Sequence, residues 1–391
     1  MREGWEIKTL EDLFDIGSSK RVYESQWRNA GVPFYRAREI VKLSRDGFVD
    51  NELFIDEELY KEYANKYGTP KCGDIMVTGV GTLGVCYIVK KNDKFYFKDG
   101  NILWFKSKEG TNPFYVNYAF KSNYLRQQID NCNGATVGTF TIVRAKKTTI
   151  PVPPLAEQER IVEELDLLSS IIDKKKAQLK ELDQLAQSIF YDMFGDPITN
   201  EKGWEVQALS TVCDVRDGTH DSPKYVDNGY PLITSKNVVN GTISFDNVNL
   251  ISERDLIAIN ARSKVDDGDI IMPMIGTIGK PTIVIKTREF AIKNVALIKF
   301  SEAKRVLNIY IQKLLDSESY SRFIKEQNRG GTQKFISLGM IRKLPTPLPP
   351  LSLQQEFASK IEAIERQKSL IQQSIVETQT LFDSRMDYWF G

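Results

Sequence analysis

The side chains that commonly build catalytic centres are scarce in this chain. It has one histidine, His220, which argues against a multi-histidine metal site and a Ser-His-Asp triad. Its four cysteines, Cys72, Cys86, Cys132 and Cys213, lack Cys-x-x-Cys spacing, which predicts buried thiols in a reducing compartment rather than a zinc site or disulfide. The sequence therefore predicts no catalytic, cofactor-binding or metal site in this chain.

The single histidine lies in a turn-rich stretch, Asp217-Gly218-Thr219-His220-Asp221-Ser222-Pro223. Three interpretations of His220 stay open: an ordinary loop residue, a contact to DNA, and a catalytic base. Only the last would make this chain an enzyme in its own right.

Two glycine-rich turns could in principle hold a phosphate. They are Gly81-Thr82-Leu83-Gly84 and Gly276-Thr277-Ile278-Gly279. Neither has the spacing and Lys-Ser/Thr ending of a Walker loop, since Lys280 follows the second copy without a hydroxyl residue after it. A tight turn between two strands is favoured, and such a turn can still present backbone N–H groups to a DNA phosphate.

The stretch Asn112-Pro113-Phe114-Tyr115 is similar to the Asn-Pro-Pro-Tyr/Phe motif of DNA adenine methyltransferases. The second proline is missing, however, and no G-x-G cofactor loop follows a strand. Asn is a favoured helix cap and Pro a favoured first helical residue. We therefore predict a helix that starts at Pro113.

Polar and basic residues recur beside aromatic residues in matching loops of the two halves. These residue types read base edges and hold phosphates, although ordinary exposed loops share the composition. In the first half the candidates for DNA contact are Ser18, Ser19, Lys20, Arg21, Tyr35, Arg36, Arg38, Thr82 and Thr136. In the second half they are Thr219, His220, Ser222, Lys224, Ser235, Lys236, Asn237, Thr277, Thr332, Gln333 and Lys334. The two sets differ in sequence, which suits two domains of one fold that read different targets.

The elements that position these loops are duplicated. Pro151-Val152-Pro153-Pro154-Leu155 recurs as Pro347-Leu348-Pro349-Pro350-Leu351, and Gly4-Trp5-Glu6 recurs as Gly203-Trp204-Glu205. Short β-rich runs, among them 75–77, 85–89, 270–272 and 282–285, indicate mixed α+β halves. We predict globular domains over 1–150 and 197–346, followed by helical segments over 151–196 and 347–391.

Each helical segment carries a heptad pattern of apolar residues, typical of helices that pack lengthwise. Lys175 interrupts the first pattern, in a Lys174-Lys175-Lys176 run, and Gly195 and Gly391 stand where each helix would end. The predicted pairing residues are Ile161, Leu165, Leu168, Ile172, Leu179, Leu182, Ile189, Phe357, Ile361, Ile364, Ile371, Ile375, Phe382 and Trp389.

Charge is distributed unevenly along the chain. The net charge is +1, yet residues 1–150 and 197–346 each carry +4, whereas residues 151–196 carry −5 and residues 347–391 carry −2. A bound nucleic acid would therefore face the globular domains rather than the helices, although the bias is modest. No apolar run approaches the length of a membrane span, so we expect a cytoplasmic protein with no membrane contact.

Taken together, these features resemble the DNA-specificity subunit of type I restriction–modification enzymes, over essentially the whole chain. The resemblance rests on the two Gly-Trp-Glu openings, the two Gly-Thr-x-Gly turns and Gly330-Gly331-Thr332-Gln333-Lys334. Its most characteristic part is the Pro-x-Pro-Pro-Leu-x-Glu-Gln run over 151–158 that leads into a heptad helix. The second copy departs from this run at 352–355. The first half also departs from the family pattern, with Ala135-Thr136-Val137-Gly138 where the family usually has a Gly-Thr-Gln-like run.

The resemblance implies two target-recognition domains, each of which reads one part of a split duplex DNA site through the major groove. It implies an antiparallel coiled-coil spacer on which two methyltransferase subunits dock, with restriction subunits joining through them. S-adenosylmethionine, ATP and Mg would belong to those partners.

Duplication by itself predicts a pseudo-two-fold arrangement in which the helices act as a ruler. A helix from Ala156 to Phe194 would span roughly 58 Å, which bounds the distance between half-sites at about 17 base pairs. The alternatives are a scaffold protein assembled through its helices and an independent enzyme.

Overall fold

The computed structural model describes residues 3–130, 138–239, 241–274, 280–327 and 336–391. The chain forms two compact units. The first unit combines Met1–Lys176 with Gln373–Gly391, and the second unit is Ala177–Gln372. The boundary falls inside both long helices, so each unit contains a globular domain together with parts of both. The functional division at 150, 196 and 346 stays a prediction.

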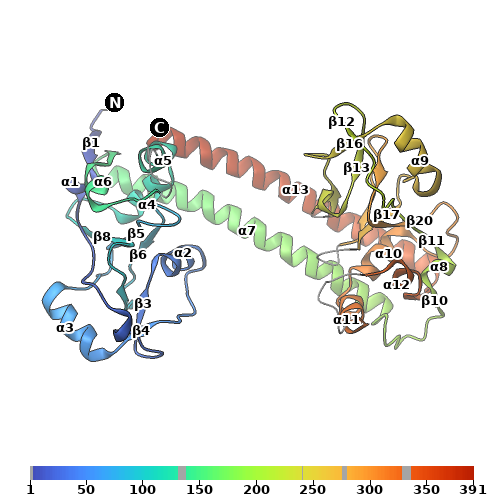
Figure 1. The fold of residues 1–391 in the computed structure, drawn as a ribbon, viewed down its shortest axis with the longest axis horizontal. Helices are drawn as coiled ribbons and strands as arrows, with labels where there is room; N and C mark the ends of the chain where they lie inside the picture. Colours follow the sequence, from blue (N-terminus) through green and yellow to red (C-terminus); the bar gives the residue numbers. More distant parts are fainter. Residues whose placement is uncertain (1–2, 131–137, 240, 275–279, 328–335) are drawn as a thin grey trace. The chain divides into compact units, whose positions relative to one another are not determined.

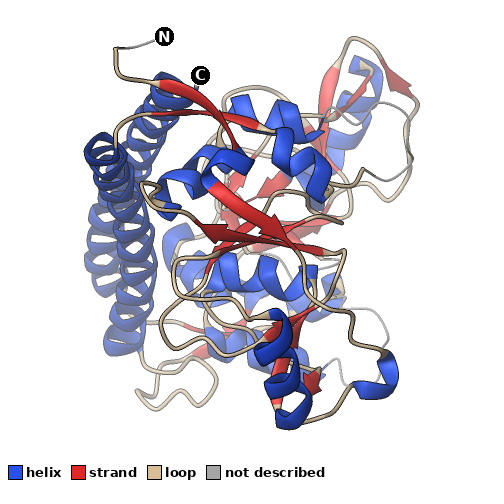
Figure 2. Cartoon of the chain, turned by 90° about the vertical axis from the view of Figure 1, so that its left-hand side faces the viewer, coloured by secondary structure: helices blue, strands red, loops and turns tan. Residues whose placement is uncertain are grey.

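Both units combine strands and helices (Figures 1 and 2). The strands of the first unit are β1 (Glu6–Thr9), β2 (Phe14–Gly17), β3 (Val32–Tyr35), β4 (Phe54–Ile55), β5 (Ile75–Thr78), β6 (Cys86–Ile88), β7 (Tyr96–Phe97), β8 (Ile102–Ser107) and β9 (Thr149–Val152). Its helices are α1 (Leu10–Leu13), η1 (Glu24–Gln26), α2 (Ala37–Asp46), α3 (Glu57–Tyr67), α4 (Pro113–Lys121), α5 (Asn123–Asp130) and α6 (Ile142–Lys147). The long helix α7 (Leu155–Phe194) begins in this unit.

The strands of the second unit are β10 (Val206–Ala208), β11 (Asp214–Asp217), β12 (Tyr225–Val226), β13 (Tyr230–Ile233), β14 (Val238–Val239), β15 (Thr242–Ile243), β16 (Asn249–Ile251), β17 (Ile270–Pro273), β18 (Thr282–Ile283), β19 (Ala291–Ile292), β20 (Val295–Lys299) and β21 (Pro345–Pro347). Its helices are α8 (Leu209–Val212), η2 (Ser235–Asn237), α9 (Glu253–Ser263), α10 (Asn308–Leu315), α11 (Glu318–Gln327) and α12 (Leu338–Arg342), followed by the start of α13 (Leu351–Phe390).

The predicted duplication is confirmed at the level of sheet topology. The central sheet has the order β2-β8-β5-β6 in the first unit and β11-β20-β17-β18 in the second. In both units a smaller sheet has one parallel pair, β3 with β7 and β13 with β19. The predicted β-rich runs at 75–77 and 270–272 are strands β5 and β17.

The central strands are buried on both faces. In β8, Leu103 and Phe105 pack in a core with α4 and α5, whereas Ile102 and Trp104 pack in a second core with α2. Alternate residues of a strand point to opposite faces, so each side chain has a core to enter. The sheet is therefore a fixed support for the loops at its ends.

The start of each long helix is anchored by a buried glutamine from the repeated motif. The Gln158 side chain, 1% exposed, accepts from the Asn112 backbone N–H at 2.9 Å and donates to the Pro153 carbonyl at 3.0 Å. Gln354, 0% exposed, accepts from the Leu307 N–H at 2.9 Å and donates to the Pro349 carbonyl at 2.8 Å. Because a buried amide must be hydrogen-bonded, this glutamine joins the helix to its own domain in both units.

The C-terminal end of each long helix packs into the core of the unit opposite to the one in which the helix begins. In the first unit, Phe390 at the end of α13 lies 5.1 Å from Tyr115 between ring centroids. In the second unit, Phe194 at the end of α7 lies 4.8 Å from Tyr310 and 5.1 Å from Phe357. Gly195 follows α7 with a φ of 75°, the left-handed conformation of a helix stop, as predicted.

The predicted pairing residues are buried or half-buried in the unit to which each belongs. In the first unit, Arg385 of α13 donates to both carboxylate oxygens of Glu164 of α7, with one Nη2–Oε2 distance of 3.0 Å. In the second unit, Lys368 of α13 pairs with Asp183 of α7 at 2.7 Å. Within each unit the two helices therefore contact one another through polar as well as apolar side chains.

Asn112 caps α4 as predicted. Its side-chain oxygen accepts from the Phe114 N–H at 2.9 Å, and Pro113 occupies the first turn. The similarity of this stretch to a methyltransferase motif is thus explained by a helix start.

Candidate nucleic-acid interface

The loop after β2, residues 18–21, is fixed by hydrogen bonds to the sheet. Ser18 donates its hydroxyl to the Ile102 carbonyl at 3.0 Å, and Ser19 donates to the Phe97 carbonyl at 2.6 Å. The Lys20 backbone N–H donates to the Tyr96 hydroxyl at 3.0 Å. The serines therefore hold the loop, and the side chains that remain exposed there are Lys20 and Arg21.

Arg36 and Arg38, predicted as DNA contacts, are bound to carboxylates. Arg36 donates to Glu39 at 3.0 Å, and Arg38 donates to both Glu39 and Glu52. Burial alone would raise the pKa of Glu39, but the hydrogen bonds from the two arginines outweigh it and hold that pKa below its usual value. The carboxylates balance the two guanidinium charges, so DNA contact by these arginines would require rearrangement.

Tyr35 stacks on Phe95 with ring centroids 4.8 Å apart. Burial, and then the charges of Asp93 and Glu39, raise the pKa of its hydroxyl. The Tyr35 hydroxyl therefore stays protonated at neutral pH and keeps its ability to donate a hydrogen bond.

The first Gly-Thr-x-Gly segment connects the antiparallel strands β5 and β6, as predicted. Gly81 and Gly84 have φ values of 70° and 68°, and the Thr82 carbonyl accepts from the Thr78 hydroxyl. The Thr82 side chain is exposed at the turn. The second turn, with Thr277, lies outside the described residues, as do Thr136, Thr332, Gln333 and Lys334.

His220 stands in a polar cluster in the second unit. Its Nε2 lies 2.8 Å from Asp217 Oδ2, and its Nδ1 lies 2.9 Å from Asn294 Oδ1. Arg262, near the end of α9, also donates to Asp217. The hydrogen bond to Asn294 and then that to Asp217 raise the pKa of His220 above its ordinary value. Two acceptors favour the doubly protonated ring, because only the imidazolium donates from both nitrogens.

The raised pKa predicts a pH-dependent contribution to stability. A group that binds its proton more tightly when folded stabilises the fold fully below its unfolded pKa, about 6.5, and loses that contribution as pH rises through the folded value. We expect a His220→Gln variant to unfold at a lower temperature than the parent at pH 6 and at the same temperature at pH 9. Because the chain has one histidine, its imidazole NMR signals titrate alone. A midpoint at or below about 6.5 would contradict the assignment.

The other second-unit candidates divide between structural and exposed positions. Asn237 is buried at 9% exposure, and its side-chain oxygen accepts from the Thr234 backbone N–H and hydroxyl at 3.0 and 2.9 Å. The Thr219 backbone N–H donates to the Ile292 carbonyl at 3.0 Å. Lys224 and Lys236 are exposed and Ser235 is half-buried. Lys293, which sequence reasoning did not select, donates its ammonium to the Ser222 hydroxyl.

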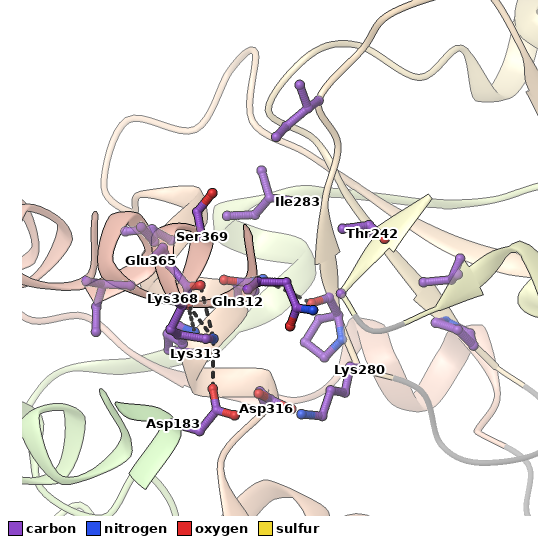
Figure 3. A pocket seen from close by; sticks show the side chains of 18 of the residues that line it. Asp183, Thr242, Lys280, Ile283, Gln312, Lys313, Asp316, Glu365, Lys368 and Ser369 are labelled. Carbon is purple, nitrogen blue, oxygen red and sulfur yellow. Dashed lines mark hydrogen bonds and ion pairs between the residues drawn. The ribbon is translucent and has the colours of Figure 1, made fainter. Parts of the chain in front are cut away.

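A groove of about 1250 Å³ in the second unit is lined in part by Ser235 and Lys236. Figure 3 shows other lining residues, among them Lys280, Lys313 and Glu365. Within the groove, Lys313 donates to Glu365 at 3.2 Å, whereas Lys280 has no ion pair among the described residues. Lys280 was not among the candidate DNA contacts, although it directly follows the second Gly-Thr-x-Gly turn in the sequence. That position is the sequence feature that could have indicated it. Burial raises the pKa of Asp316 above its ordinary value. The positive charges of Lys280 and Lys313 reduce this rise in part.

The described residues contain no group of three or more His, Cys, Asp or Glu arranged to hold a metal ion. Among them there is also no helix of the length and apolarity needed to cross a bilayer.

Comparisons with known proteins identify relatives of both halves. The family model for the type I restriction modification DNA specificity domain matches residues 2–184 and 201–379. A putative type I restriction enzyme specificity subunit of Haemophilus influenzae is 31% identical over 170 residues, which cover 42% of this chain and 41% of that protein. The MjaIX specificity subunit of Methanocaldococcus jannaschii is 22% identical over 92% of this chain and 86% of its own length.

Solved structures share the fold. A chain from a study of complex assembly and conformational transition of the type I R-M system aligns with a TM-score of 0.62 at 17% identity, covering 99% of this chain and 97% of that one. The type I restriction–modification S subunit of M. genitalium aligns with a TM-score of 0.53 at 14% identity, covering 99% and 96%. With two matched domains that together span most of its length, this chain belongs to the type I restriction–modification DNA specificity domain family.

Proposed function

We propose that this chain is the DNA-specificity subunit of a type I restriction–modification complex. Each globular half reads one part of a bipartite duplex site, and the chain itself performs no catalysis. The observation that carries the proposal is that one sheet topology occurs twice with different side chains in the corresponding loops. Two copies of one fold with unlike loops suit two unlike half-sites.

The long helices would pair antiparallel as a coiled coil and relate the halves by a pseudo-two-fold axis. The polar contacts of α7 with α13 within each unit support this pairing. Two methyltransferase subunits would dock on the helices and adjoining surfaces, and restriction subunits would join through them. S-adenosylmethionine, ATP and Mg would be bound by those partners.

The first test is binding of duplex DNA by the chain with its methyltransferase partner at several salt concentrations. Phosphate contacts release counterions, so the logarithm of the affinity should fall linearly with the logarithm of salt concentration. A scaffold protein assembled through its helices would show no such binding, and that outcome would favour the alternative function.

A single exposed loop residue should affect one half-site only. Lys236 is exposed at the groove of the second unit. We expect Lys236→Ala to weaken DNA binding. The base preference at the second half-site should become less strict or stay as it is, and the base preference at the first half-site should not change. Methylation of a library randomised in each half-site measures this separately. A change of base preference in the first half-site would contradict independent reading.

A further inference from the structure

Two exposed lysines of the first unit, without an ion pair among the described residues, lie where the loop after β2 approaches the end of α3. Lys20 Nζ lies 5.8 Å and Lys66 Nζ lies 5.5 Å from the centre of the Tyr67 ring. All three side chains are exposed, with Tyr67 at 39%. Sequence reasoning selected Lys20 but missed Lys66 and Tyr67, because they lie on a helix distant in sequence from the loop.

This cluster stands on a rigid base. Tyr63 of α3 donates its hydroxyl to the Arg21 carbonyl at 3.3 Å, and its ring lies 5.6 Å from that of Tyr96. Tyr96 in turn accepts from the Lys20 backbone N–H at 3.0 Å, and Val22 is buried beside both tyrosines. Buried contacts thus join the loop to the helix. They fix the backbone positions of Lys20 and Lys66 before a ligand binds.

The charge balance distinguishes this cluster from its neighbours. Arg21 pairs with Asp99 at 3.0 Å, and the guanidinium groups of Arg36 and Arg38 pair with Glu39 and Glu52. Lys20 and Lys66 have no ion pair within the described part of the chain. Two ammonium groups lie near one aromatic ring, and neither is paired with a carboxylate among the described residues. An anionic partner would therefore stabilise them more than it would stabilise the paired cations nearby.

The second unit places basic residues at the corresponding position. The loop after β11 contributes His220, and the last turn of α9 contributes Arg262. There both side chains bind Asp217, which has no acidic counterpart in the first-unit loop Ser18–Arg21. The same junction is therefore basic in both units, but in the second a carboxylate balances it.

We propose that this junction is a clamp for the DNA backbone: in the first unit Lys20 and Lys66 hold phosphate oxygens while Tyr67 packs against the adjoining sugar, and in the second Asp217 restrains Arg262 and His220 from the same contact. The clamp positions the duplex and carries no base preference. This inference rests on the proposed function, because it presumes that duplex DNA is the ligand.

The test uses the full chain with its methyltransferase partner and a mixed-sequence duplex long enough to span both half-sites. For the double variant Lys20→Gln/Lys66→Gln we expect the slope of log affinity against log salt to become shallower by about two, roughly one for each phosphate contact. The methylated motif should stay unchanged.

The matched control is Lys94→Gln/Lys106→Gln, which removes the same charge from lysines already paired with Glu57 and Asp15. It should change the slope by less than half as much. In the second unit, Asp217→Asn should steepen the slope by about one, because it releases Arg262.

The outcomes separate the clamp from the proposed function. If the parent binds duplex with a steep salt dependence and the Lys20/Lys66 variant keeps the parental slope, the clamp is wrong and the function stands. An equal loss in variant and control would also overturn the clamp, since general charge would explain it. If the parent itself shows no salt-dependent binding, the proposed function fails first.

Discussion

A Phe390→Ala variant is expected to lose about 3–5 kcal/mol of unfolding free energy in the first unit, as other buried Phe→Ala changes do. Phe390 is 1% exposed and packs against Tyr115, whose hydroxyl donates to the Pro151 carbonyl at 2.7 Å. The last turn of α13 thus fills a core built mainly by residues more than 200 positions earlier. The loss should lower the melting temperature of that unit by about 10 °C.

Leu381→Ala is the control, because Leu381 lies on the same helix but is 50% exposed. We expect it to change stability by no more than about 0.5 kcal/mol. Hydrogen exchange followed by mass spectrometry can report on α4 in the first unit and α10 in the second. Faster exchange in α4 alone is expected for Phe390→Ala, and an equal effect in both helices would contradict the assignment of this residue to the first core.

Lengthening both long helices by one turn is expected to change the gap between half-sites. Four residues inserted between Lys176 and Ala177, and four between Gln372 and Gln373, fall at the boundary of the two units and leave each unit's contacts intact. Each insertion adds about 6 Å of helix, which corresponds to at most about two base pairs. The bases within each half-site should not change, because no loop of either domain is altered.

The control inserts four residues into α7 alone. Since α7 and α13 contact each other in both units, a one-sided insertion misaligns them and should abolish methylation rather than shift the gap. Sequencing of methylated sites measures both variants. If the doubly lengthened chain methylates sites with the parental gap, the helices are not the ruler.

Sequence alone predicted the features that rest on local periodicity and repetition. The strands at 75–77 and 270–272, the Asn112 cap and the helix stop at Gly195 follow from residue types within a few positions, and the structure confirms them. The duplicated topology followed from repeated motifs in the same order. These features can be predicted because residues close to one another in the sequence determine them.

Features that depend on tertiary contacts could not be predicted in this way. Nothing near Phe390 in the sequence indicates that it enters the core around Tyr115. Lys175 interrupts the apolar pattern of α7, and its neighbours in the sequence do not indicate what it contacts. The structure places its ammonium 2.6 Å from the Ser374 hydroxyl oxygen and 3.0 Å from that of Thr378.

The candidate interface shows the same limit. Arg36 and Arg38 have the residue type of a DNA contact, but only the fold brings Glu39 and Glu52 against them. Residue type therefore selected the loops as candidates, whereas only the structure shows which of their cations lack an ion pair among the described residues.

Methylome sequencing of a host that expresses this chain together with its methyltransferase partner tests whether one chain reads two separated half-sites. We expect one bipartite motif, with two specified parts and an unspecified gap of no more than about 17 base pairs. A contiguous motif, or no motif dependent on this chain, would contradict the account.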